Sequence, residues 1–220
     1  MIIINFKIYQ ETFGDKAINL AKIVKEVSEK YKIRIIITAS ALDAYRIQKE
    51  TGAEVWLQNV DEYRDGKHTG WISSDQALEL GIKGSLLNHF EHQIPKGTVQ
   101  KIIKNKSPDF KIICCAKHVG QIDSWIAKAK PDFILYEPPE LIGSSTSSVA
   151  SLPDCIKKAV NSSGDVPLIV GAGVKSRQDV VTSLKYGAKS VGLASAFVLS
   201  QNPRELLEEI AAGFDGIIQK

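Results

Sequence analysis

Cysteine is scarce in this 220-residue sequence, and its placement excludes two kinds of site. The three cysteines are the adjacent pair Cys114 and Cys115 and the distant Cys155. This spacing gives neither a disulfide framework nor a set of metal ligands. We therefore expect no bound metal, and we expect reduced thiols that are buried or half-buried, as free cysteine usually is.

Long apolar runs and blocks of like charge are also missing. No apolar stretch approaches the roughly 18 residues of a membrane span, and the N-terminus enters a strand without a basic or cleavable leader. The net charge is only +3, and the lysines are scattered over helix faces rather than interleaved with aromatic residues. We therefore expect a cytoplasmic protein that binds neither a membrane nor nucleic acid.

The sequence does contain a regular alternation of apolar, β-rich runs with helical segments. The β-rich runs lie near residues 2–6, 33–38, 55–59, 83–88, 111–115, 132–136, 167–171 and 189–193. Neither a linker nor a low-complexity tract divides the chain, so residues 1–220 are expected to form a single domain. Eight alternations in this length predict the α/β class and a compact (β/α)8 barrel. A doubly wound open sheet is the alternative, which periodicity alone does not exclude.

Three of the predicted helices carry start signals. Ser73 with Gln76 can form a capping box, and a helix opens near Ser176. Asn202 followed by Pro203 combines an N-cap residue with a proline suited to the first helical position. Each of these signals follows a predicted strand, as a βα alternation requires.

Ionisable residues end three of the predicted strands. Lys7 ends the first strand, His89 and Glu91 end the fourth, and Glu137 ends the sixth. In a (β/α)8 barrel the active site lies at the C-terminal ends of the strands. Each residue alone is more often an ordinary surface charge, but convergence on one rim indicates a catalytic site. The other histidines lack this context and are expected at the surface or at an interface: His68, His92 and His118.

The segment after Glu137 is typical of a base beneath a mobile loop. Pro138 ends the strand and confines Glu137 to extended conformations. Small polar residues then follow over positions 143–148. A carboxylate at a strand end, under a loop with a stiff base and a small-residue tip, suits catalysis under a closing lid.

Two turns of small residues follow the last two predicted strands. They are Val170-Gly171-Ala172-Gly173-Val174 and Gly192-Leu193-Ala194-Ser195-Ala196. In (β/α)8 enzymes a phosphate group often binds backbone N–H groups of the loops after strands 7 and 8. The alternative is that these small residues serve only the close packing of helices on the barrel.

Taken together, these residues resemble the triosephosphate isomerase family in its short archaeal form, over essentially the whole chain. The resemblance is carried by Asn5-Phe6-Lys7, His68-Thr69-Gly70, Gly84-Ser85-Leu86-Leu87-Asn88-His89, Glu137-Pro138-Pro139-Glu140-Leu141-Ile142-Gly143, Gly171-Ala172-Gly173 and Leu193-Ala194-Ser195. The run that begins at Glu137 and the run that ends at His89 are the most specific of these segments.

The resemblance implies interconversion of D-glyceraldehyde 3-phosphate and dihydroxyacetone phosphate through an enediolate, without a cofactor. Glu137 would be the base, His89 the neutral electrophile, and Lys7 the cation that stabilises the oxyanion. This family is itself the standard example of a glutamate base paired with a histidine that a helix N-terminus keeps neutral. A helical turn over residues 90–93 would supply that helix N-terminus.

The resemblance also assigns the substrate-binding residues. Glu91 would hold Lys7 in place, and Asn5 would line the substrate side. The phosphate group would be bound by the lid and by backbone amides, at the residues Ile142, Gly143, Gly173, Val174, Ala194 and Ser195. Because Gly143 belongs to the lid, phosphate binding would itself favour lid closure.

The chain departs from the family's pattern directly after the histidine. The family usually has serine, glutamate and then a basic residue, whereas this chain has Phe90-Glu91-His92-Gln93. Phe90 cannot donate the hydrogen bond with which that serine holds the glutamate when the lid is open. The lid also has Ser145-Thr146-Ser147 where the family often has Gly-x-Pro. We expect an active enzyme with slower turnover.

The long polar loop around Thr69 predicts self-association. In the family this loop reaches into the site of a neighbouring subunit, so a homodimer or homotetramer is expected. An ordinary solvated loop in a monomer is the alternative. For function, the alternatives are a non-catalytic barrel that binds a small phosphorylated ligand and an isomerase acting on a larger phosphosugar.

Overall fold

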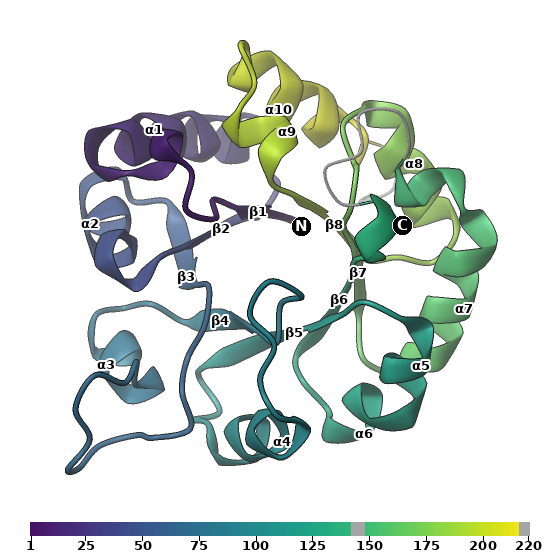
Figure 1. Cartoon of the computed structure of the whole chain (residues 1–220). Helices are drawn as coiled ribbons and strands as arrows, with labels where there is room; N and C mark the ends of the chain where they lie inside the picture. Colours follow the sequence, from purple (N-terminus) through teal and green to yellow (C-terminus); the bar gives the residue numbers. More distant parts are fainter. Residues whose placement is uncertain (142–147, 216–220) are drawn as a thin grey trace.

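The computed structural model describes residues 1–141 and 148–215 as a closed barrel surrounded by helices (Figure 1). The strands are β1 (Ile2–Asn5), β2 (Ile35–Ala39), β3 (Glu54–Leu57), β4 (Gly84–Leu87), β5 (Lys111–Ala116), β6 (Phe133–Tyr136), β7 (Leu168–Val170) and β8 (Ser190–Leu193). All pairings are parallel, and β8 closes on β1, where Ile2 lies opposite Val191. The predicted (β/α)8 barrel is confirmed, and the open sheet is excluded. The domain boundary at residue 220 stays a prediction, because residues 216–220 lie outside the described residues.

Helical segments occupy every connection between consecutive strands. They are η1 (Gln10–Thr12), α1 (Gly14–Tyr31), α2 (Ala41–Thr51), α3 (Ser74–Glu79), α4 (Lys96–Asn105), α5 (Val119–Gln121), η2 (Ile122–Ile126), α6 (Ala127–Ala129), η3 (Pro139–Leu141), η4 (Val149–Ser151), α7 (Pro153–Ser163) and α8 (Arg177–Lys185). After β8 the chain continues through α9 (Ser195–Val198) and α10 (Pro203–Ala212). The longer helices lie outside the barrel of strands (Figure 1).

The barrel interior is filled by apolar side chains. They come from β1 to β7 and are Ile3, Ile36, Trp56, Leu86, Ile113, Cys115, Leu135 and Ile169. Trp56 is the largest of the fully buried side chains. Its ring lies over Gly84, where an added Cβ would come within 2.5 Å of the indole. The interior is therefore a packed core, and any site must lie at one end of the barrel.

A second apolar layer lies between the strands and the helices. Strand β1 contributes Ile2 and Ile4 to this layer, and Phe6 follows from the same face. Helix α1 meets them with Ala17, Ala21, Val24 and Val27, which are all buried. The period of two in a strand and of 3.6 in a helix explains why alternate strand residues face this layer.

The helix start signals have mixed outcomes. Ser176 and Asp179 form a complete capping box at α8, where the sequence predicts a helix start. The Ser73 hydroxyl accepts hydrogen bonds from the amides of Asp75 and Gln76, which is the N-cap half of the predicted box. Asn202 occupies the N-cap position of α10, which begins at Pro203 as predicted, but its side chain caps no amide. Its backbone, at φ −129° and ψ 69°, is not in the extended conformation typical of capping residues.

The three thiols are free, as the sequence predicts. Cys114 and Cys115 are buried, and Cys155 is half-buried. Burial raises the pKa of the Cys114 thiol to about 12. Burial, and then the negative charge of Glu137, raise the pKa of Cys115 as well. Both buried thiols are therefore poor nucleophiles at neutral pH.

The described residues contain neither a membrane-spanning helix nor a cluster of metal ligands. No helix in this part of the chain is both long and apolar enough to cross a bilayer. No group of three or more histidine, cysteine, aspartate or glutamate side chains among these residues could hold a metal ion.

Candidate active site

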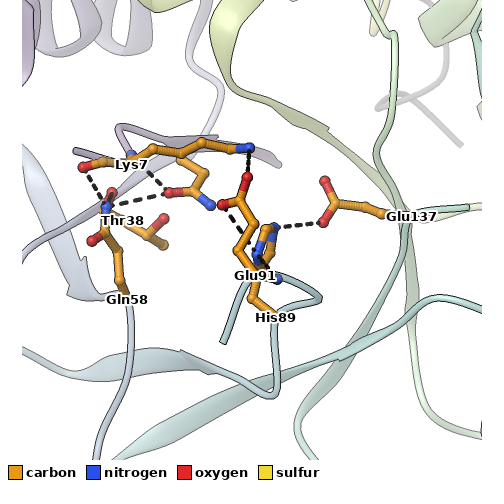
Figure 2. Close-up of polar contacts among 7 residues, drawn as sticks. Lys7, Thr38, Gln58, His89, Glu91 and Glu137 are labelled. Atoms are coloured by element: carbon orange, nitrogen blue, oxygen red, sulfur yellow. Dashed lines mark hydrogen bonds and ion pairs between the residues drawn. The ribbon is translucent and has the colours of Figure 1, made fainter. Parts of the chain in front are cut away.

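Lys7 follows β1 at the mouth of the barrel, in a conformation that needs outside support. Its φ angle is +50°, in the left-handed region that side chains other than glycine rarely adopt. The Asn5 carboxamide oxygen accepts a hydrogen bond from the Lys7 amide at 2.9 Å. The Gln58 amide group, which follows β3, donates to the Lys7 carbonyl oxygen at 2.9 Å (Figure 2). The first bond is local to β1 and the second reaches across from the end of β3, and together they fix the backbone from which the lysine side chain projects.

The Lys7 ammonium group forms an ion pair with Glu91. Its Nζ atom lies 2.7 Å from Glu91 Oε1. The lysine side chain is only 14% exposed, whereas that of Glu91 is 47% exposed. An ammonium group has three N–H donors, so this pair leaves two of them for other acceptors. The contact that the resemblance implies between Glu91 and Lys7 is thus present.

His89 is buried at the end of β4, and its two ring nitrogens have different surroundings. The Nδ1 atom accepts a hydrogen bond from the Glu91 amide at 3.3 Å, and Glu91 Oε2 lies 3.5 Å from it. A neutral ring whose Nδ1 is an acceptor carries its hydrogen on Nε2. Nε2 is the atom that faces Glu137 (Figure 2).

The expected helical turn after His89 is not a helix. The backbone makes one hydrogen-bonded turn, from the His92 amide to the His89 carbonyl at 2.8 Å. Helix α4 begins only at Lys96, because Pro95 restricts the preceding residue to extended conformations. A single turn lacks the summed dipole of a helix, so the geometry gives no support to the helix-dipole argument at this position.

Glu137 directly follows β6 and points toward His89. Its Oε2 atom lies 3.3 Å from His89 Nε2. The carboxylate also lies against Gly171 at the end of β7, where an added Cβ would come within 2.5 Å of Glu137 Oε1. Only a residue without a side chain at position 171 leaves room for this orientation. The sequence analysis names Gly171 only as part of a turn and does not predict that it orients Glu137.

A cavity of about 550 Å³ joins Lys7, Glu91 and Glu137 to the two small-residue turns. Its lining includes Lys7, Phe90, Glu91, Glu137, Gly173, Val174, Ala194 and Ser195. Among the described residues, the amides of Gly173, Val174 and Ala194 donate no hydrogen bond to the protein. The amides of Lys175 and Ser176, in contrast, both donate to the Asp179 carboxylate. The backbone N–H groups available to an anion are therefore those of the two turns. The N-terminus of α8 is not available in the same way, because the Asp179 carboxylate of that helix accepts its hydrogen bonds.

A second cavity, of about 420 Å³, lies on the other side of Lys7. Asn5 and Gln58 line it, together with His89 and His92. Asn5 lines this cavity together with Lys7 and His89 and supports the Lys7 backbone, and its place on the substrate side stays a prediction. His68, His92 and His118 are exposed, as expected.

Two predicted site residues fall outside the described residues. These are Ile142 and Gly143, which belong to the lid. The structure adds Gln58 and Lys175, which the sequence analysis does not single out, and it gives Gly171 a role beside Glu137 in addition to its place in a turn. Gln58 follows a strand in the same way as Lys7 and Glu137, so its position at a strand end could have identified it as a site residue. Lys175 lines the cavity one residue beyond the Gly171–Val174 turn.

Fold and site together define a class: a (β/α)8 barrel enzyme with a carboxylate, an imidazole and an ammonium group at its mouth, beside turns with available backbone N–H groups. Comparison with known proteins gives the family within that class. A sequence model described as triosephosphate isomerase matches residues 1–210. The chain belongs to the triosephosphate isomerase family, which is a family of isomerases.

Several curated proteins show the same relationship over nearly their whole length. The triosephosphate isomerase of Saccharolobus solfataricus is 36% identical over 213 residues, covering 95% of this chain and 93% of that protein. That of Methanothermus fervidus is 34% identical over 215 residues, covering 96% of each chain. That of Archaeoglobus fulgidus is also 34% identical over 215 residues, again covering 96% of each. These organisms agree with the archaeal form of the family that the sequence resembles.

Proposed function

We propose that this chain interconverts D-glyceraldehyde 3-phosphate and dihydroxyacetone phosphate, with Glu137 as the base. The reaction follows from the family. The observation that supports the assignment of the base is the 3.3 Å approach of Glu137 Oε2 to His89 Nε2 beside the larger cavity. That cavity, of about 550 Å³, is within the usual range of small-molecule sites. The family also places the reaction in glycolysis.

The proposed proton transfers use two side chains. Glu137 removes the proton from the carbon next to the substrate carbonyl, and the C–H electrons form the C=C bond of the enediolate. His89 Nε2–H donates its proton to the former carbonyl oxygen and then takes the proton of the neighbouring hydroxyl group. The second carbonyl forms there as Glu137 returns its proton to the other carbon. Both side chains end in their starting states, as a catalyst must.

Lys7 stabilises the negative charge that develops on the substrate oxygen. Its ammonium group is largely shielded from water, so its interaction with an oxyanion is stronger than it would be in bulk solvent. Glu91 holds the ammonium group by one N–H and leaves donors for the substrate. The proposed role of Asn5 is to support the backbone of Lys7.

The phosphate group is proposed to bind the turns after β7 and β8. The available amides of Gly173, Val174 and Ala194 support this role, and Ser195 opens the short helix α9 beside them. Backbone N–H groups bind anions well because each presents a fixed partial positive charge. The contribution of Ile142 and Gly143 stays a prediction, because these residues lie outside the described part of the chain.

A variant of the base tests the proposal. Glu137→Gln keeps the size of the side chain but removes the proton acceptor. We expect its turnover in a coupled assay with glyceraldehyde 3-phosphate to fall by about 10²- to 10⁴-fold, the usual contribution of a general base. Glu79→Gln, at an exposed position on α3, is the matched control and should match the parent. A Glu137→Gln variant as fast as the parent would contradict the assignment.

The binding-only alternative makes a different prediction for the same proteins. A non-catalytic barrel would bind inorganic phosphate while the parent turned over no faster than Glu137→Gln. Membership of an isomerase family favours the enzyme, and no feature of the described residues favours the alternative.

We further propose that the chain forms a homo-oligomer through the loop between β3 and α3. Within this loop Tyr63 packs on His68 and Trp71, with ring centroids 4.4 and 4.8 Å apart, and Trp71 remains 52% exposed. The cavity beside Lys7 has an apolar rim at Ile8, which is 74% exposed. A second copy of the loop, with Thr69 at its tip, would cover this apolar surface. A cytoplasmic location stays a prediction.

A further inference from the structure

Phe90 contacts both Lys7, which carries the positive charge of the site, and His89, which is proposed to transfer protons. Its ring centroid is 5.7 Å from Lys7 Nζ and 4.9 Å from the centre of the His89 imidazole, with the ring planes at 49°. The ring also lines the larger cavity, and it lies beside Glu137 in the small space behind that cavity. A single half-buried side chain thus contacts both Lys7 and His89 and borders the Glu137 carboxylate.

The ring of Phe90 attracts the Lys7 ammonium group without occupying an N–H donor, which the ion pair with Glu91 does not do. Glu91 is half exposed, so water competes with it for the ammonium group and weakens the ion pair. An aromatic face attracts a cation through its quadrupole and does not occupy a hydrogen-bond donor in doing so. The ring of Phe90 can therefore hold the ammonium group while leaving its N–H donors available to a substrate oxygen.

The contact with His89 restricts the imidazole in a similar way. Tilted aromatic pairs with centroids 4.5–7 Å apart are favourable, and a phenyl ring loses little conformational freedom when it is held. His89 has a hydrogen bond at Nδ1, and the ring of Phe90 packs on the imidazole itself. Together they fix the direction of Nε2, and misplacing a reacting group by about 1 Å can cost on the order of 10²-fold in rate.

We propose that Phe90 is a positioning residue for the isomerisation, whose ring holds the Lys7 ammonium group and the His89 imidazole at the substrate. This inference rests on the proposed function. The proposed role of Phe90 depends on its aromatic ring and is separate from the absence of a hydroxyl group at that position. The sequence alone indicates only that absence.

Substitutions at Phe90 distinguish the effect of an aromatic ring from that of an apolar side chain without one. Phe90→Leu keeps an apolar side chain and removes the quadrupole, and we expect kcat to fall by about 2- to 30-fold. The inhibition constant for inorganic phosphate should change less than about twofold, because the phosphate turns are untouched. Phe90→Tyr keeps the ring and should restore kcat to within about twofold of the parent. Phe90→Ser should also be slower than the parent, whereas the family's pattern alone would predict that a serine here speeds turnover.

Phe133→Leu is the matched control. Phe133 is also a half-buried phenylalanine, but it begins β6, at the opposite end of the strand from Glu137, and packs on the barrel interior. Its kcat should match the parent. A Phe90→Leu or Phe90→Ser variant as fast as the parent, or faster, would overturn the proposal, as would loss of kcat in Phe90→Tyr equal to that in Phe90→Leu.

A measurement that needs no turnover distinguishes failure of this inference from failure of the proposed function. The imidazole signals of His89 in nitrogen-edited NMR spectra should move in Phe90→Leu and stay in place in Phe133→Leu, because only the first change removes the neighbouring ring. If the parent shows no isomerisation, the proposed function fails whatever these signals do. If the parent isomerises and the His89 signals are unchanged in Phe90→Leu, this inference alone fails.

Discussion

Glu137 can face His89 because residue 171 has no side chain. The carboxylate occupies the space that a Cβ at position 171 would fill, with Oε1 at 2.5 Å and Cγ at 2.7 Å from that point. Neither Gly171 nor its amide needs to touch the substrate for this effect. The orientation of the proposed base is therefore set by a neighbouring strand as well as by its own.

Gly171→Ala should displace the Glu137 carboxylate and lower activity. We expect kcat to fall by about 10- to 100-fold, since small displacements of a reacting group have effects of this size. The control is Gly97→Ala on α4, where an added Cβ meets no atom within 4 Å, and it should leave kcat unchanged. Steady-state kinetics measure both. A Gly171→Ala variant with full kcat would show that Glu137 does not need the orientation seen here.

The sequence predicted which residues reach the barrel mouth but not how they are held there. Lys7, His89 and Glu137 follow from the topology, because the ends of parallel strands meet on one rim. The hydrogen bond from Gln58 to the Lys7 carbonyl depends on the pairing of β1, β2 and β3, which alternation does not specify. The left-handed backbone of Lys7 was equally invisible, because the residue type does not indicate it.

At the scale of the elements, β3 and β4 fit together through one large and one absent side chain. Trp56 on β3 is fully buried, and its ring lies where a side chain at Gly84 on β4 would be. The indole N–H donates to Glu54 at 3.0 Å, so the ring is anchored at one edge. This arrangement fills the interior next to the strand that ends in His89.

Gly84→Ala should destabilise the barrel. An added Cβ would lie 2.5 Å from the indole ring and 2.7 Å from the Lys111 carbonyl oxygen, so strands β3, β4 or β5 must shift. We expect a loss of about 1–3 kcal/mol in the free energy of unfolding, the usual cost of overpacking a core. Urea denaturation at fixed protein concentration measures it. Gly120→Ala on α5, where nothing lies within 4 Å, should not lower stability, and equal midpoints for the two variants would contradict this account.

Helix starts were less predictable than strands. The capping box of Ser176 formed because Asp179 lies three residues on and reaches back to the backbone. Asn202 has a suitable side chain, but capping needs backbone angles that a residue type does not guarantee. The turn after His89 stayed a turn because Pro95 prevents a helix from continuing through Ile94. Each error concerns local backbone angles rather than the existence of an element.

At the scale of the whole molecule, the proposed association predicts a mass of at least two chains. Size-exclusion chromatography with light scattering at micromolar concentration measures it. Thr69→Arg, in the loop, should shift the mass toward one chain by placing a charge against the apolar rim at Ile8. Thr98→Arg on α4 is the control and should keep the parent mass. A parent that elutes as a monomer would remove the role proposed for the loop.

The central claim is that Glu137 moves a carbon-bound proton through an enediolate. Isomerisation in D2O, followed by NMR, tests it most directly. The parent should give product with solvent deuterium on the carbon that receives the proton, and Glu137→Gln should lose product and deuterium together. Isomerisation by the parent without any solvent deuterium would contradict the enediolate. Unchanged deuterium incorporation by Glu137→Gln would contradict the base.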